Sequence, residues 1–240
     1  MTRRFLMAAG LVLSLLVAST PFAAAQTEPD VAEIGKAVSA ADPTALIAAL
    51  ETPIPASDLP EGFTEATYVD INSATGAASE DCMYDASSVA VEGAAGYVVT
   101  ADPEAIPYKY TCASINYLAF DEADMGSDPL GDFKEGVESG LAESATPAAE
   151  GTPAEDNGQA TVTDTTVAGE DAILITYTLR QEGASVVVQT LAIPVGNVFV
   201  VALVSVGDTA TVDPADIETL ANDLTVAAIT YLGTVAESAQ

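Results

Sequence analysis

Ile173-Leu-Ile-Thr-Tyr-Thr-Leu-Arg180 carries an apolar side chain at every second position, and Val198-Phe-Val-Val-Ala-Leu-Val-Ser-Val206 is apolar almost throughout. A third extended run, residues 185–193, lies between them. A period of two is typical of a half-buried strand, and a continuous apolar run is typical of a central strand covered on both faces. The turns at Glu182-Gly183 and 194–197 are too short for crossover connections. The three runs therefore predict a three-stranded antiparallel meander.

A helix is predicted directly after the meander. Asp213-Pro214 supplies an N-cap and a first-turn proline, and Gly233 is placed to end the helix. Apolar residues recur between these points at the spacing of one helix face: Ile217, Leu220, Ala221, Leu224, Ala228, Tyr231 and Leu232. The predicted fold class is therefore α+β, an antiparallel sheet packed against amphipathic helices on one or both faces.

The first half of the chain predicts the same two kinds of element. Helices are expected at residues 31–41 and 45–50, and the second is opened by Asp42-Pro43. Extended runs are expected at 64–71, 96–100 and 108–120. Asp128-Pro129 repeats the helix-start signal. The apolar stripe behind it comprises Leu130, Phe133, Val137 and Leu141, with glycines between them that weaken a helix.

Composition and charge exclude several classes of function. The 240 residues contain 36 Asp or Glu, 6 Lys or Arg, and neither His nor Trp, for a formal charge of −30. Without histidine there is no Ser-His-Asp or Cys-His catalysis and no His-ligated zinc or haem. Such a charge repels phosphate backbones, which excludes nucleic acid as a charge-bound partner. The evenly spread acids fit either adaptation of all exported proteins to salt or acid, or a cation-binding surface.

The N-terminus predicts export. Met1-Thr-Arg-Arg precedes an apolar run from Phe5 to Val17, and Ala23-Ala24-Ala25 follows. This order is typical of a secretory signal peptide cleaved after Ala25, and the apolar run is too short to span a bilayer. An uncleaved anchor helix is the alternative. We expect a signal peptide at 1–25 and a single secreted or extracytoplasmic domain at 26–240, with no membrane span in the mature chain.

One segment inside that domain is expected to be a disordered loop. Residues 144–159 are rich in Thr, Pro, Ala and Glu and contain no large apolar side chain to bury. We do not expect the chain on either side of the loop to form a hydrophobic core alone, so we expect the loop to interrupt one domain.

The two cysteines, Cys82 and Cys112, predict one disulfide. Closing a loop of this length should contribute about 3–4 kcal/mol in the chain-entropy model. A redox-active pair is the alternative, but there is no Cys-x-x-Cys and no local cluster of basic residues to lower a thiol pKa.

Two clusters are candidate binding sites. Tyr97, Tyr108 and Tyr110 surround the cysteine-bearing hairpin and could line a small apolar pocket, or could simply pack in and around the core. Residues 121–128 form an acidic stretch, in which Asp121, Glu122 and Asp124 could bind calcium. The alternative is a solvated loop whose last acid, Asp128, caps the next helix.

Catalytic and nucleotide-binding motifs are absent from the sequence. It contains no G-x-x-x-x-G-K-[ST], G-x-G-x-x-G, G-x-S-x-G or S-x-x-K, and no cofactor is expected. Paired carboxylates for a glycosidase are available everywhere and therefore point to no particular site.

The order of elements from Phe133 to Leu232 is similar to the PsbP-like fold, a group that includes exported actinobacterial lipoproteins of the LpqN type. The resemblance rests on three segments: the run from Asp171 to Thr178, the run from Ala192 to Ala202, and the predicted C-terminal helix. The resemblance implies a non-catalytic module that acts as an adaptor or assembly partner. We therefore expect an extracytoplasmic binding or interaction module, with an unidentified protein or small ligand at the cell exterior as its partner. The alternatives are a carboxylate-based secreted hydrolase and a calcium-stabilised surface protein.

Overall fold

The structure is a computed structural model of the chain, and it describes residues 28–71, 91–106, 110–121, 125–144, 159–181, 184–207 and 213–239. The predicted signal peptide at 1–25 lies outside these residues. So does 145–158, nearly all of the predicted loop. The outer residues of that expected loop belong to regular elements: Ser144 ends a helix and Gln159 begins a strand.

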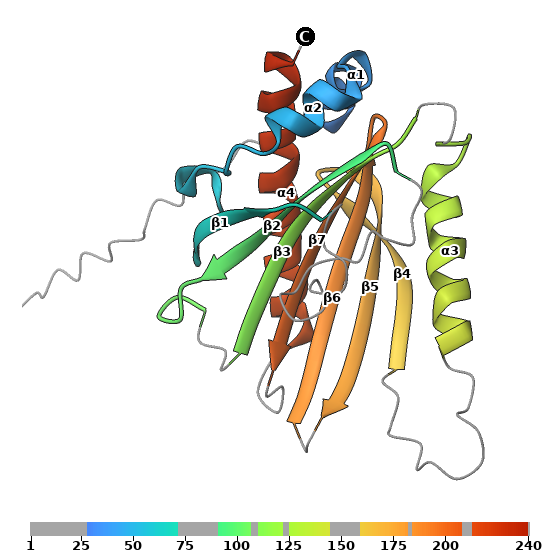
Figure 1. The fold of residues 1–240 in the computed structure, drawn as a ribbon. Helices are drawn as coiled ribbons and strands as arrows, with labels where there is room; N and C mark the ends of the chain where they lie inside the picture. The colour runs from blue at the N-terminus through green and yellow to red at the C-terminus, as the bar shows by residue number, and fades with distance from the viewer. Residues whose placement is uncertain are drawn as a thin grey trace, which may run out of the picture.

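One antiparallel sheet forms the centre of the molecule, and its seven strands lie in the order β1-β2-β3-β7-β6-β5-β4 (Figure 1). The strands are β1 (Phe63–Val69), β2 (Gly93–Ala101), β3 (Tyr110–Ala119), β4 (Gln159–Val167), β5 (Glu170–Gln181), β6 (Ala184–Val195) and β7 (Val198–Gly207). The predicted α+β class is confirmed.

The predicted meander is present as β5, β6 and β7, and β4 extends it by one strand. A two-residue turn, Ala168-Gly169, joins β4 to β5, and both residues adopt positive φ (+49° and +84°). This backbone twist matches that of the flanking strands. The sequence analysis missed β4 because its threonines and Asp164 continue the polar composition of the preceding segment.

β7 is the central strand, and its alternate side chains enter two separate cores. Val200, Ala202 and Val204 join the larger core, which also contains residues of α4 (Pro214–Ser238). Phe199 and Val201 join a smaller core on the opposite face. The prediction that this strand is covered on both faces is therefore confirmed. We call the two sides of the sheet the α4 face and the α3 face.

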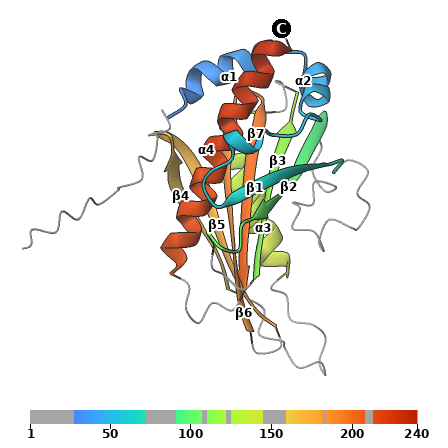
Figure 2. The ribbon, with the colours of Figure 1, turned by 90° about the vertical axis from the view of Figure 1, so that its left-hand side faces the viewer.

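On the α4 face, α4 crosses the sheet and α1 (Val31–Ala40) lies over its C-terminal end (Figure 2). α2 (Pro43–Ala49) follows α1 and contacts β2, and a short 3₁₀ helix, η1 (Ala56–Asp58), contacts β1. The predicted aspartate caps are present. The backbone N–H of Ala215 donates to Asp213 Oδ1 at 3.0 Å, and that of Ala45 donates to Asp42 Oδ1 at 2.9 Å.

Gly233 does not end α4, contrary to the prediction. The helix continues to Ser238, and Gly233 is buried against α1. A Cβ added to Gly233 would meet Ile34 Cγ1 at 3.0 Å. The glycine is therefore explained by the close approach of the two helices, a tertiary contact that local sequence signals do not reveal.

On the α3 face lies α3 (Pro129–Ser144), beside β4, β5 and β6. The Phe133 ring stacks on Phe199 with centroids 5.0 Å apart, and Lys134 Nζ lies 2.6 Å from Asp164 Oδ1. α3 begins as predicted, with the Gly131 N–H donating to Asp128 Oδ1 at 3.0 Å. None of the helices in the described ranges is both long enough and apolar enough to cross a membrane.

Candidate functional site

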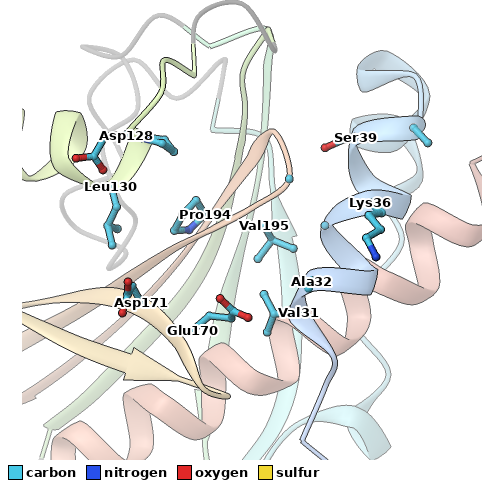
Figure 3. Close-up of a pocket in the computed structure, with 14 residues that line it drawn as sticks. Val31, Ala32, Lys36, Ser39, Asp128, Leu130, Glu170, Asp171, Pro194 and Val195 are labelled. Carbon is cyan, nitrogen blue, oxygen red and sulfur yellow. The ribbon is translucent and has the colours of Figure 1, made fainter.

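An open groove of about 750 Å³ lies where four separate segments meet: α1, the turn between β6 and β7, the start of α3, and the start of β5 (Figure 3). α1 forms one wall, and the first residues of α3 and β5 form the other. The turn between β6 and β7 lies between these walls. No segment contributes enough residues to form the groove alone, so it depends on the tertiary arrangement.

Two glycines allow α1 to lie against the turn. Gly196 adopts φ +61°, which favours glycine, and a Cβ there would come within 2.5 Å of the Gly35 carbonyl oxygen. It would also lie 2.7 Å from Ser39 Oγ. On the helix side, a Cβ on Gly35 would meet the Gly196 nitrogen at 3.0 Å. The base of the groove is therefore a backbone contact that leaves no room for a side chain.

The middle of the groove is apolar. Val31 and Val195 are buried there, and Leu130 and Pro194 are half-buried (Figure 3). Ala32 completes this surface from α1. Half-buried side chains of this kind can lose further contact with water when an apolar ligand binds.

Carboxylates line one side of the groove. Glu170 and Asp171, at the start of β5, and Asp128, before α3, all contribute to its lining and are exposed. None of the three has an ion-pair partner within the described ranges. Asp128 uses one oxygen to cap α3. This side of the groove is therefore electrostatically suited to a positive group.

The opposite wall carries Lys36, whose Nζ lies 2.7 Å from Glu33 Oε1, with both side chains largely exposed. The Glu33 carboxylate accepts a hydrogen bond from Lys36 and raises the pKa of this ammonium group. Lys36 therefore stays charged at neutral pH, paired with an acid of its own helix.

Tyr97, one of the three predicted pocket residues, lies in the core. Its side chain is fully buried, and its hydroxyl donates to the Leu50 carbonyl and also lies 3.1 Å from the Thr52 carbonyl oxygen. Leu50 is the C-cap of α2 and Thr52 follows it, so the hydroxyl satisfies backbone carbonyl groups that the end of the helix leaves without a partner inside the helix. This environment favours the core alternative for Tyr97.

Two further tyrosines share this arrangement. The Tyr231 hydroxyl donates to the Thr52 carbonyl at 2.6 Å, and the Tyr117 hydroxyl donates to the Ala228 carbonyl within α4 at 3.0 Å. Tyr97 forms edge-to-face contacts with both rings, at 6.4 and 6.0 Å. The three tyrosines together link α4 and the C-terminal end of α2 to β2 and β3. Tyr108 and the side chain of Tyr110 lie outside the described residues, so their part in a pocket stays a prediction.

The disulfide and calcium predictions also rest partly on undescribed residues. Cys112 is half-buried on β3, whereas Cys82 lies outside the described ranges, so the bridge stays a prediction. Asp121 is exposed at the end of β3, and Glu122 and Asp124 are outside. Within the described ranges, no group of three His, Cys, Asp or Glu residues is placed to hold a metal ion.

The sequence analysis did not identify the groove, although it recognised several of its parts. It identified the turn at 194–197 and Asp128-Pro129 as local signals. No signal in the sequence indicated that these two segments meet α1 and the start of β5, because the contact joins residues far apart in the chain.

Comparison with known proteins finds two similar solved structures. No known protein family and no curated protein matches the sequence. The chain is similar to LpqN of Mycobacterium tuberculosis, a protein involved in cell envelope biogenesis, with 17% identity and a TM-score of 0.27 over 54% of this chain and 68% of that one. It is also similar to PA94 of Pseudomonas aeruginosa, a protein of unknown function, with 16% identity and a TM-score of 0.31 over 55% and 76% of the two chains. The LpqN type inferred from the order of elements is thus among the structures found.

Proposed function

We propose that the protein is a non-catalytic binding module of the extracytoplasmic space. Its groove holds a small ligand that carries a cationic group on an apolar body. The extracytoplasmic setting is supported by the leader pattern of residues 1–25 and by the pair of cysteines.

The observation that carries the proposal is the composition of the groove. Val31, Leu130 and Pro194 supply an apolar surface, and Glu170 and Asp171 border it with negative charge. An apolar surface with a few convergent polar groups is the usual composition of a small-molecule site. The charge of the whole chain, −30, further enriches cations near the surface.

The absence of catalysis in the proposal rests on the chemistry of the available groups. The chain has no histidine for proton transfer at neutral pH. Lys36 is the amine that lines the groove, and its raised pKa keeps it protonated and therefore non-nucleophilic. The groove is thus better suited to hold a ligand than to transform it.

The test is an NMR titration of the full chain, expressed with its own leader and exported. Octylammonium is the probe, and octanol is its neutral counterpart. We expect octylammonium to shift the backbone amides of 31–39, 128–130, 170–171 and 194–196, and octanol to shift them far less. Shifts spread evenly over the acidic surface would contradict the proposal, since they would indicate unspecific cation condensation.

A pair of matched variants separates the groove from general charge. Glu170→Gln with Asp171→Asn should weaken octylammonium binding about two- to tenfold, because each removes an exposed charge contact. Glu65→Gln with Glu237→Gln makes the same change in net charge at exposed positions outside the groove lining and should leave binding unchanged. Equal weakening by both pairs would refute the assignment. Equal amide shifts with calcium chloride would favour a calcium-stabilised surface protein instead.

A further inference from the structure

Among the described strands, β4 is one of the two at the edges of the sheet, and it pairs only with β5 (Figure 1). An edge strand presents a row of unpaired backbone N–H and C=O groups, which can accept another strand. The pairing of β4 with β5 runs from Gln159 to Val167 without a shift in register. The backbone of β4 is therefore regular along its whole length.

The turn at Ala168-Gly169 determines which residues point to the side of β4 away from β5. In a two-residue hairpin the residues flanking the turn, here Val167 and Glu170, exchange both backbone hydrogen bonds. Hydrogen-bonded positions then alternate with outward-facing positions along the strand. Ala160, Val162, Asp164 and Thr166 therefore direct their N–H and C=O groups away from β5.

The other edge strand, β1, is irregular where β4 is regular. Its register with β2 shifts between Phe63 and Glu65, whereas helices or a 3₁₀ turn lie beside both strands: η1 beside β1, and α3 and α4 beside β4. A bulge is a common way of blocking unwanted pairing at a sheet edge. β4 contains no proline and no irregularity over its nine residues. The difference indicates that β4 keeps the regular geometry that an added strand requires.

Side chains beside β4 offer subsites on both faces of the sheet. On the α4 face a small pocket of about 340 Å³ lies between β4 and α4, and Thr165, Leu191, Glu218 and Asn222 contribute to its lining. On the α3 face, Asp164 is 78% exposed although it pairs with Lys134. A strand added at β4 would direct alternate side chains toward Glu218 and toward Asp164.

We infer that the free edge of β4 binds an extended, basic peptide segment of another protein as an eighth strand. Strand addition of this kind takes affinity from backbone hydrogen bonds and specificity from the alternate side-chain sites. Glu218 on the α4 face and the chain's formal charge of −30 select for lysine or arginine in the added strand, whereas Asp164 on the α3 face is already paired with Lys134. A second copy of this chain is disfavoured, because two molecules that each carry a formal charge of −30 repel one another. None of the residues that form this surface lines the groove described above.

The test uses three synthetic peptides with the full chain. One alternates valine and lysine, the second alternates valine and glutamate, and the third repeats the first with every second backbone nitrogen methylated. We expect the first to bind, the second not to bind, and the third to bind at least about tenfold more weakly, because methylation removes several backbone hydrogen bonds. Equal binding of the first and third would refute strand addition, since charge alone would then account for binding.

Amide hydrogen exchange provides a readout specific to this geometry. Binding of the lysine peptide should slow exchange at residues 160, 162, 164 and 166, and leave the alternate amides, already bonded to β5, unchanged. Val162→Pro removes an outward N–H without breaking a bond to β5 and should abolish binding, whereas Val162→Thr should retain it. Protection without this alternation would overturn the inference. So would a dimer in light scattering of the chain alone, since a second copy would then be the occupant.

Discussion

The contact between α1 and the turn joining β6 to β7 can be tested with two glycine substitutions. Gly196 and Gly169 both lie in two-residue hairpin turns, Gly196 at the first position and Gly169 at the second, and both adopt positive φ, +61° and +84°. They differ in their surroundings. A Cβ on Gly196 would meet the Gly35 carbonyl oxygen at 2.5 Å, whereas a Cβ on Gly169 would have nothing within 4 Å. Gly169→Ala is therefore a matched control for Gly196→Ala.

The expected magnitudes follow from this difference. Placing alanine at positive φ costs about 1–2 kcal/mol, and both variants bear this cost. Ala168, in the same turn as Gly169, already adopts φ +49°, so the control position tolerates a Cβ nearby. At Gly196 the neighbour is backbone and cannot rotate away, and such overpacking adds about 1–3 kcal/mol. We therefore expect Gly169→Ala to destabilise by about 1–2 kcal/mol and Gly196→Ala by about 2–5 kcal/mol.

Urea unfolding, without reducing agent, measures both values under the same conditions. The midpoints should differ while the slopes stay equal, because neither substitution changes the surface exposed on unfolding. Gly196→Ala should also displace α1 and weaken octylammonium binding, since Gly196 forms the base of the groove. Equal destabilisation by the two variants would refute the backbone contact on which this description of the groove depends.

Three further predictions concern titration and thiols. Asp223 on α4 is exposed but partly desolvated by its neighbours, which raises the pKa of its carboxyl, so the folded state slightly disfavours its charge. The contribution of this carboxyl group to the free energy of unfolding is fully present below its unfolded pKa of about 3.9. It is lost as the pH rises through the pKa of the group in the folded state. Asp223→Asn should therefore slightly raise the melting temperature at neutral pH but not in acid, and an equal rise at both pH values would contradict this reasoning. Burial also raises the pKa of Tyr97 and Tyr117 above its usual range. In an alkaline absorbance titration these two phenols should ionise only on unfolding, and stability should fall above about pH 10, the unfolded tyrosine pKa; ionisation at that pH in the folded state would contradict their burial. Alkylation of the denatured, unreduced protein should label neither cysteine, and labelling of both would contradict the predicted disulfide.

Local patterns predicted those elements whose signals repeat within one segment. The alternation from Ile173 onward identified β5, and the apolar run from Val198 identified a central strand, because side-chain period and burial are coupled within a strand. Asp213 and Asp42 were recognised as caps because capping depends on only a few neighbouring residues. β4 was missed because threonine and Asp164 on an exposed edge resemble the composition of a loop.

The sequence by itself determined the α+β class, the meander, the helix starts, and a formal charge of −30 that repels phosphate backbones. Only the tertiary structure decided that β3 pairs with β7, that Gly233 lies against α1 within a continuing helix, and that α1 meets Gly196 at the base of a groove. It also decided that β4 is an edge strand. The physical reason is the range of the interactions. Periodicity and capping act over a few residues, whereas strand order and helix packing depend on how the whole chain buries both faces of one sheet.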